Sequence, residues 1–481
     1  MQDFLLLIIS TINTYMSNYI LLFLLISVGL WYSFKTKFVQ IRCFGEAIRR
    51  IIDGLSFQGE KQKIGVTSFQ AFLNALAAQI GTGNIVGASG AILMGGPGAI
   101  FWMWIIAFFG MATIYAETVC ALKTRKIESD GTIKGGPAYY ITTAFKGKFG
   151  KFLGKFFAIS TTMAVGFTGN MVQSNSIGFT LNNAFGVPNW ITGIFLASIC
   201  WFIFRGGLVR LASVTEKIVP IMSYLFIGGA VAIIIARIQY LPEALYMIFY
   251  YAFQPQAIIG GAFGEALKIA VTQGAKRGLF SNEAGMGSTP HAHVQANVEN
   301  PHEQGIVAMI GVFFDTFVVL TLNALVIIST LYTSDGVLVN GYKGEVTEII
   351  NQANLAQVAF ASVLDAGLHE GFGSQFIAIC LFFFAFSTIL AWHSFGKINI
   401  VYLFGEKIIN VYIVIALTFI FIGTLVSSDF VWEMTDLFNN FMVIPNAIAL
   451  FALTNMVVDS CAGLKKVDSK KDTLNKNDKK F

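Results

Sequence analysis

The most informative polar residues of this sequence lie inside an apolar stretch. Residues 70–109 are almost all apolar, but their middle reads Gln79-Ile80-Gly81-Thr82-Gly83-Asn84. Each glycine costs a helix about 1 kcal/mol relative to alanine, so this run predicts an interruption. In hydrocarbon, broken helix is tolerated only against protein or a cavity. Unwound carbonyls then hold cations and half-helix N-termini face anions. The alternative is a packing face of small residues, which lets helices approach closely.

Two further polar features occur in apolar segments. The run Val271-Thr272-Gln273-Gly274 predicts a second interrupted helix, and Gln173 lies in the middle of a predicted helix. Asp315 also falls mid-span, where a carboxylate costs at least ~2.5 kcal/mol on insertion scales and is a functional candidate by default. Paired interruptions in two halves of a chain are the strongest pointer in sequence to a transporter binding site.

The composition defines the environment of these residues. The chain has 481 residues, 55% hydrophobic and 12% charged, with a net charge of +5, whereas soluble domains carry roughly 25% charged residues. This predicts an all-α membrane protein in contact with the lipid bilayer, and the charge is no signal for nucleic acid. The five cysteines show no close pairing and are interpreted as small apolar residues. His291 and His293 have no evident third ligand, so we expect no metal other than sodium.

Hydropathy predicts eleven transmembrane helices, at about residues 18–34, 68–94, 99–122, 156–185, 190–204, 215–235, 257–278, 305–332, 372–395, 408–426 and 431–458. Of the 32 lysines and arginines, all but Arg237, Lys268 and Lys343 then fall in alternate loops or the C-terminal tail, with Lys276 and Arg277 counted in one of these loops. The positive-inside rule predicts an outer N-terminus and a cytoplasmic C-terminus, in the plasma membrane or inner membrane of a cell.

The division of the chain follows from the two interruptions. Residues 1–63 would hold an extra first helix and a cytoplasmic amphipathic segment. Residues 64–238 and 239–460 would be two five-helix halves, each starting with a broken helix, and 461–481 a charged cytoplasmic tail. Because five is odd, the halves would have opposite orientations in the membrane, which predicts a 5+5 inverted repeat.

Four motifs make this sequence resemble the alanine or glycine:cation symporters, also called sodium:alanine symporters. They are Gly95 to Trp104 (GGPGAIFWMW), Ile80 to Gly87 (IGTGNIVG), Gly169 to Ser176 (GNMVQSNS) and Lys276 to Ser288 (KRGLFSNEAGMGS). The likeness extends over about residues 15–460. It implies a LeuT-type fold with broken second and seventh helices, and symport of a small neutral amino acid with sodium.

The resemblance also implies which residues form the site. The backbone N–H groups of Gly81, Thr82 and Gly83 would bind a substrate carboxylate. The ammonium would meet carbonyls near Gln273 and Gly274, and the amide oxygens of Gln79 and Gln173. Trp392 would cap the pocket; the alternative is a lipid-facing or packing tryptophan.

Sodium requires oxygen ligands. Alignment with LeuT-type proteins puts the Ala77 and Ile80 carbonyls at one sodium position, and we add Asn84 to this set. Phe384, Ser387 and Thr388 are spaced i, i+3, i+4 and therefore share one helical face. The alternative is that both hydroxyls only bond back to carbonyls of their own helix. Asp315 would be a coupling group, or a proton carrier if protons replace sodium.

One segment departs from the family pattern. After Phe384 to Leu390 (FAFSTIL), residues Ala391 to Lys397 (AWHSFGK) lack the usual glycine before tryptophan and the usual glutamate at the position of Lys397. This difference would affect gating or substrate range.

Other classes of function fit less well. No phosphate-binding loop is evident, and no clustered catalytic groups suggest an enzyme. Two broken helices favour alternating access over a channel. We therefore expect sodium-coupled symport of alanine or glycine without a cofactor, with another small amino acid or proton coupling as the alternative.

Overall fold

A computed structural model describes residues 2–56, 65–129, 131–255, 262–339 and 350–462 of the chain. The first residues of the predicted seventh span, Lys343 and almost all of the charged tail lie outside the described residues. The protein is mostly helical, and its one sheet among the described residues is a two-stranded antiparallel hairpin. By length and composition, 6 of the described helices can cross a membrane, or up to 8 if each bent pair is one span.

The elements of the first part of the chain are α1 (Gln2–Tyr15), η1 (Met16–Leu21), α2 (Leu22–Lys35), α3 (Val39–Arg42), α4 (Phe44–Ser56), α5 (Ser68–Gln79), η2 (Gly83–Gly87), α6 (Ala88–Gly95), α7 (Ala99–Thr124), β1 (Lys126–Ile127), β2 (Ile133–Lys134), α8 (Pro137–Ala144), α9 (Gly147–Thr161), η3 (Thr162–Thr168), α10 (Gly169–Phe185), α11 (Asn189–Arg205) and α12 (Gly207–Ala236).

The elements that follow are η4 (Ile238–Tyr240), α13 (Leu241–Phe253), α15 (Phe263–Asn282), α16 (Pro290–His293), α17 (Pro301–Phe313), η5 (Phe314–Leu320), α18 (Thr321–Ile327), η6 (Ile328–Tyr332), α19 (Leu355–Gly367), α20 (Phe372–Phe404), η8 (Glu406–Ile408), α21 (Ile409–Gly423), α22 (Ser428–Ala452) and α23 (Thr454–Ala462).

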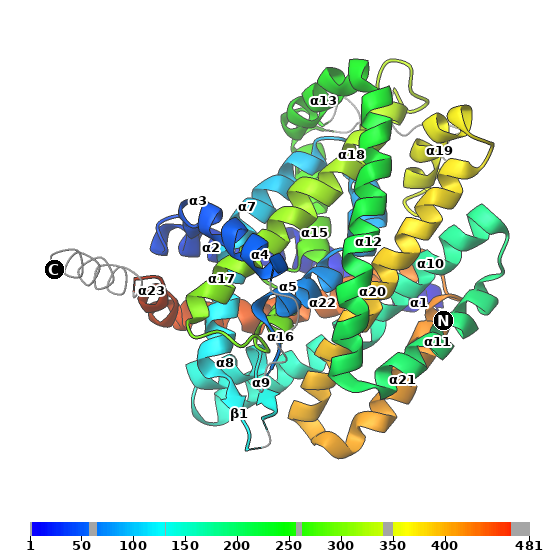
Figure 1. The fold of residues 1–481 in the computed structure, drawn as a ribbon. Coiled ribbons are helices and arrows are strands. Elements are labelled where there is room, and N and C mark those ends of the chain that lie inside the picture. Colours follow the sequence, from blue (N-terminus) through cyan, green and yellow to red (C-terminus); the bar gives the residue numbers. More distant parts are fainter. Residues whose placement is uncertain (1, 57–64, 130, 256–261, 340–349, 463–481) are drawn as a thin grey trace, which may run out of the picture.

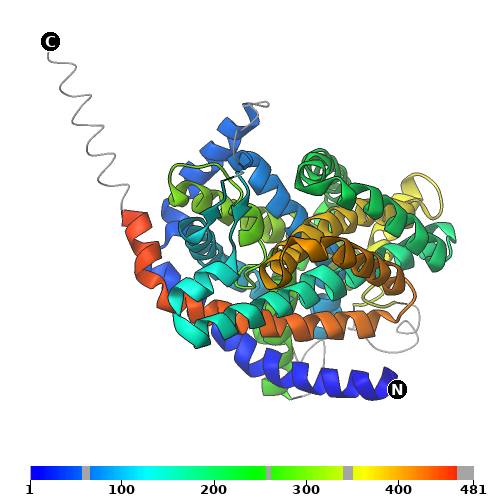
Figure 2. The same ribbon diagram turned by 90° about the horizontal axis from the view of Figure 1, so that it is seen from below.

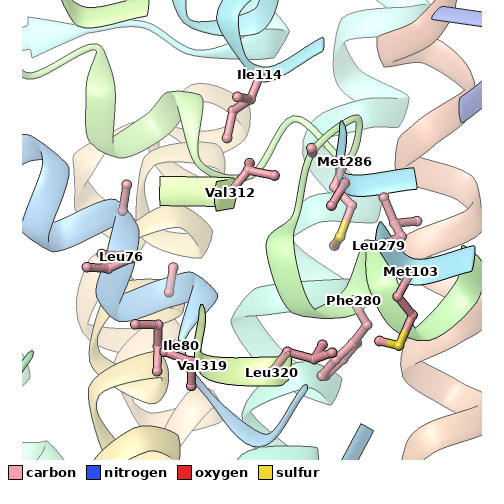
Figure 3. Packing of buried hydrophobic residues seen from close by; sticks show 14 of the residues in the cluster. Leu76, Ile80, Met103, Ile114, Leu279, Phe280, Met286, Val312, Val319 and Leu320 are labelled. Atoms are coloured by element: carbon pink, nitrogen blue, oxygen red, sulfur yellow. The ribbon is translucent and has the colours of Figure 1, made fainter. Parts of the chain in front are cut away.

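The helices form one bundle around α5, α15, α20 and α22 (Figure 1). Figure 2 shows α1 lying along α22, and Asn13 Nδ2 donates to Glu433 Oε2 at 2.6 Å across this contact. Close to the interruption of α5, Ile80 lies beside Val319 while Phe280 of α15 lies near Leu320 (Figure 3), all within one buried apolar cluster. This packing brings both halves of the chain to the interruption.

The seventh span differs from the sequence prediction. The expected interruption at residues 271–274 is wrong, because α15 is continuous from Phe263 to Asn282. The helix ends instead at Glu283, which has a left-handed backbone (φ 60°), and the chain is helical again only at α16. Gly274 packs against α7, where an added Cβ would stand 2.7 Å from the Ala99 carbonyl oxygen. This glycine therefore serves close helix packing and does not break the helix.

The continuous α15 also changes the place of Lys276 and Arg277. The sequence analysis counts both as loop residues, but they lie inside the helix. Lys276 Nζ is 2.6 Å from Asp436 Oδ2, and Arg277 Nη1 is 3.5 Å from the same oxygen. Their charges are therefore matched by α22 and do not mark a loop on one side of the membrane.

Candidate functional site

Helix α5 has a capped start and ends where the backbone leaves the helical conformation. Thr67 caps its start, with reciprocal hydrogen bonds between Thr67 and Gln70, and this capping box satisfies two N–H groups that a helix start leaves free. At the other end, Ile80 leaves the helical conformation (φ −80°, ψ 92°). The helical halves on either side, Ser68–Gln79 and Gly83–Gly95, are bent by 46°. A break therefore lies in the polar run, and its residues are buried.

The two glycines of the break let other helices approach it. A Cβ added at Gly81 would collide with Thr388 Oγ1 and stand 3.2 Å from Gln173 Oε1. A Cβ at Gly83 would stand 2.8 Å from Ser281 Cα. Glycine is therefore required so that α20, α10 and α15 can contact the unwound backbone.

Oxygen atoms gather where α20 passes the break. Thr388 Oγ1 lies 2.9 Å from the Ala77 carbonyl oxygen and 3.3 Å from that of Ile80. Ser387 Oγ is 3.4 Å from the Ala77 oxygen. Both hydroxyls also lie near the Phe384 carbonyl oxygen, at 2.9 Å for Ser387 and 3.1 Å for Thr388. The bonds back along α20 thus exist, but they do not account for the carbonyls of the break.

The Thr388 hydroxyl lies among more carbonyl oxygens than it can donate to at once. A hydroxyl has a single hydrogen, yet the Thr388 hydroxyl faces carbonyls of Ala77, Ile80 and Phe384 at hydrogen-bonding distance. Such clustered carbonyl and hydroxyl oxygens are the ligand type that binds hard cations.

Asn84 belongs to a different cluster. Its Oδ1 accepts from the Gly81 N–H at 2.9 Å, and its Nδ2 donates to Asp315 Oδ1 at 2.6 Å. The Asp315 carboxyl also accepts from Ser281 Oγ at 2.9 Å and Thr316 Oγ1 at 2.8 Å. Among the described residues Asp315 has no basic partner. A buried carboxyl in this position must hold a proton or meet a cation.

The two glutamines of the predicted site lie on either side of the break. Gln173 Oε1 accepts from Thr82 N at 3.1 Å and Thr82 Oγ1 at 2.6 Å. Gln79 Nε2 donates to the Asn282 carbonyl oxygen at 2.8 Å. Gln173 Nε2 and Gln79 Oε1 are buried without a hydrogen-bond partner among the described residues. Within the part of the chain that the structure describes, each of these two glutamines therefore has one side-chain group free for a ligand.

Trp392 is buried beside the same region. Its ring packs edge-on against Phe280, with centroids 5.6 Å apart. Its Nε1 donates to Glu283 Oε1 at 2.6 Å, and Ser288 donates to the other carboxylate oxygen of Glu283. The tryptophan thus joins α20 to the chain that follows α15.

Two of the predicted substrate residues do not join this group. Gly274 packs against α7. Gln273 lies beside Gly95, and a Cβ added at Gly95 would stand 3.3 Å from the Cβ of Gln273. The residues of α15 that do reach the break are Phe280, Ser281 and Asn282. These and Glu283 were missed as site residues, although they lie within the motif Lys276 to Ser288; the left-handed Glu283 gives no signal in sequence.

The histidine pair is separated in the structure. His291 Nε2 meets Asn399 Nδ2 at 2.9 Å, and His293 Nδ1 meets Gln304 Nε2 at 3.0 Å. Each ring thus has an amide partner of its own.

Comparison with known proteins identifies the protein family. Residues 2–479 match the model of the sodium:alanine symporter family. The sodium/alanine symporter AgcS of Methanococcus maripaludis is 37% identical over 453 residues, covering 94% of this chain and 95% of that protein. The probable sodium/glutamine symporter GlnT of Bacillus subtilis is 37% identical over 460 residues, covering 95% of this chain and 90% of that protein.

Solved structures agree on the fold. MhsT in complex with L-phenylalanine superposes with a TM-score of 0.57 at 14% identity, covering 83% of this chain and 96% of that chain. A manganese transporter of Eremococcus coleocola gives a TM-score of 0.53 at 12% identity, covering 82% of this chain and 81% of that chain. These neighbours are LeuT-fold transporters and not enzymes. The chain is therefore a membrane transporter that belongs to the sodium:alanine symporter family.

Proposed function

We propose that this protein carries alanine or glycine into the cell together with sodium, by alternating access. The observation that supports the proposal most is the oxygen cluster at the break of α5. The Ala77, Ile80 and Phe384 carbonyl oxygens lie within 3.4 Å of the Ser387 or Thr388 hydroxyl oxygen. A sodium ion among them would accept all of these oxygens as ligands. It would also tie α5 to α20, so that binding favours one conformation of the two helices.

The substrate would bind beside this ion, at the break itself. The unused Gln173 Nε2 is a donor suited to a carboxylate, and the unused Gln79 Oε1 is an acceptor suited to an ammonium. The N–H groups of Gly81 and Thr82 already bond Asn84 and Gln173. A bound carboxylate would take the place of the Gln173 oxygen at Thr82. Trp392 would close the site toward Glu283.

The second cluster supports a further cation site or a proton site. Asn84, Ser281 and Thr316 hold the Asp315 carboxyl without a basic residue among those described. Sodium would use the carboxylate directly, while a proton would neutralise it. Two relatives are named sodium/proton-dependent alanine carriers, one of them putatively. Proton coupling through Asp315, or a different small amino acid, is therefore the second candidate function.

The topology proposed with this function has eleven crossings in a 5+5 inverted repeat in the plasma or inner membrane. Residues 1–63 precede the repeat, 64–238 and 239–460 form its halves, and 461–481 are a cytoplasmic tail, with the N-terminus outside. Within the described residues, helices overlap the predicted spans, and the count of eleven crossings stays a prediction. Helix α5 opens one half and α15 the other, and each ends in a non-helical segment.

Uptake into proteoliposomes separates the two candidates. Purified protein is reconstituted, and labelled alanine uptake is measured with an inward gradient of sodium, lithium or protons, each under a clamped membrane potential. Accumulation driven by sodium alone supports sodium symport. Accumulation driven by protons without sodium would refute it and point to Asp315. Unlabelled glycine, added in excess, should compete with alanine.

A further inference from the structure

A second group of ligand-type side chains lies far from the break, where the amphipathic helix α4 meets the start of α17. Cys43 precedes α4, Glu46 lies in its first turn and His302 is the second residue of α17. One ligand atom from each of these three residues lies within 4.8 Å of the other two. Cys43 and His302 are buried, and Glu46 is exposed. Cys43 and Glu46 are three residues apart but His302 is far away in sequence, so no closely spaced motif marks all three.

One ring nitrogen of His302 is hydrogen-bonded and, within the described ranges, the other is free to bind a ligand. Tyr115 of α7 forms a hydrogen bond of 2.7 Å with His302 Nδ1, and the two rings pack edge to face. His302 Nε2 is buried and has no hydrogen-bond partner among the described residues. A metal-bound histidine is commonly oriented by a bond to its other ring nitrogen. Tyr115 gives His302 such an arrangement.

We propose that Cys43, Glu46 and His302 bind a zinc-class divalent cation that joins α4 to α17. A thiolate, an imidazole and a carboxylate are the three ligand types of protein zinc sites. Sodium, magnesium and calcium prefer oxygen ligands, so the mixed set selects against the ion proposed for the break. Three protein ligands leave a fourth tetrahedral position for water.

Binding requires only a small closure of the group. Zn–S and Zn–N bonds of about 2.3 and 2.0 Å put tetrahedral ligands roughly 3.5 Å apart, so separations of up to 4.8 Å must shorten by about 1 Å. Glu46 is exposed on α4 and can supply this movement. Its present partner is Arg50, whose Nε is 3.0 Å from Glu46 Oε1. Arg50 Nη2 is also 3.4 Å from Glu303 Oε1. Arg50 would therefore retain an ion-pair partner when Glu46 binds the metal.

Nearby positive charge limits the affinity without excluding the ion. Arg42 Nη2 lies 3.0 Å from Cys461 Sγ, and Arg50 lies beside Glu46. A thiolate and a carboxylate together neutralise a divalent cation. The site is open at Glu46, which gives the ion a path from water. Such a cation would link α4 to α17 directly, where α4 already pairs with α17 through Arg50 and Glu303.

Cobalt absorption tests the site in the complete purified protein. The protein, in detergent and without a histidine tag, is titrated with Co²⁺. A thiolate-to-cobalt absorption band is expected in the near ultraviolet, together with the visible bands of a tetrahedral site, and Zn²⁺ should displace both. Cys43→Ser should abolish the thiolate band. Glu46→Gln, at an exposed position that folding tolerates, should weaken Zn²⁺ binding more than tenfold.

Two further variants distinguish specific metal binding from the general effect of replacing a buried side chain. Cys200→Ser removes another buried free cysteine and should leave the band unchanged. Tyr115→Phe removes the bond that orients His302 and should weaken binding by about 10–100-fold. Absence of a thiolate band in the unmodified protein would overturn the proposal, as would an unchanged Zn²⁺ affinity in Cys43→Ser or in Glu46→Gln. All variants are compared by melting temperature without metal, so that a folding defect is recognised.

Discussion

Gln173 connects α10 to the break of α5 through its side-chain oxygen alone. Gln173→Leu should weaken alanine binding, because the amide would no longer donate to the carboxylate. A hydrogen bond to a charged group contributes roughly 1.5–3 kcal/mol, which corresponds to a loss of about tenfold to a hundredfold in affinity. Calorimetry of alanine binding on the purified variant measures this.

The same variant has a structural cost. Thr82 N and Oγ1 both donate to Gln173 Oε1, and an unsatisfied buried donor costs about 1–3 kcal/mol. The melting temperature of Gln173→Leu should therefore fall moderately. Gln357→Leu is the matched control, because Gln357 is buried and bonds the carbonyls of Thr180 and Ser374. It should lower stability without changing alanine affinity; equal affinity losses in both variants would show that Gln173 acts only on the fold.

The substitution Gly81→Ala tests how closely α20 must approach the break. In Gly81→Ala the new methyl group would collide with Thr388 Oγ1, so the apparent sodium affinity should fall at least tenfold. Gly178→Ala, on α10, would meet only ordinary contacts, the nearest at 3.5 Å from Thr424 Cβ, and should transport normally. Sodium-dependent uptake by the two variants is the measurement. A normal sodium affinity in Gly81→Ala would contradict the assignment of the Thr388 hydroxyl.

At the residue scale, local spacing predicted part of the oxygen cluster at the break. Ser387 and Thr388 share a helical face with Phe384 by their spacing, and the structure brings this face to Ala77. Asn84 was grouped with them, but its partner is Asp315, which lies far along the chain. Only the packing of η5 against the break brings Asn84 and Asp315 together, and neither spacing nor hydropathy contains that information.

At the scale of elements, α15 is attached to α22 by ionic contacts inside the bundle. Lys276 and Arg277 share the buried Asp436. Removing one partner of a buried ion pair costs about 3–5 kcal/mol, so Asp436→Asn should lower the melting temperature strongly. The exposed pair of Lys268 and Glu265, 3.9 Å apart, is the control. Glu265→Gln should cost less than about 1 kcal/mol, and equal shifts in the two variants would show that the buried pair adds nothing.

Helices α5 and α15, both predicted to be broken, show where element prediction works and where it does not. In α5 two glycines lie within three residues, and the helix breaks there. In α15 the run around Gly274 also looks weak, but α7 packs on that glycine and the helix continues. The actual end comes at Glu283, where a left-handed residue is held by Trp392 and Ser288. Helix propensity is a weak signal that tertiary contacts override.

At the scale of the whole molecule, the proposed substrate site is tightly surrounded. Neighbouring helices fill the positions beside Gly81 and Gly83, and Trp392 closes another side. Alanine and glycine should compete for uptake, whereas leucine and phenylalanine should compete poorly. A methylene that does not fit costs about 1–3 kcal/mol, so leucine should be weaker by tenfold or more. Competition assays with each amino acid test this, including glutamine because one relative is named for it; leucine as the best competitor would refute the small pocket.

The helical membrane fold could be predicted from composition and hydropathy because apolar spans dominate the chain. The long helices α7, α12 and α20 coincide with predicted spans. The positive-inside argument was weaker than its count suggested, since Lys276 and Arg277 lie within α15. The pairing of helices from the two halves of the chain depends on long-range contacts and is visible only in the structure.

The sodium dependence of alanine uptake in Thr388→Val is the most direct test of the proposed coupling. Valine keeps the shape of threonine and removes one proposed sodium ligand. The matched control is Thr161→Val, because Thr161 is buried and bonds only back to Phe157 of its own helix, at 2.9 Å. We predict that the sodium concentration for half-maximal uptake rises at least severalfold in Thr388→Val and stays unchanged in Thr161→Val. An unchanged sodium dependence in Thr388→Val, with uptake otherwise normal, would contradict the account.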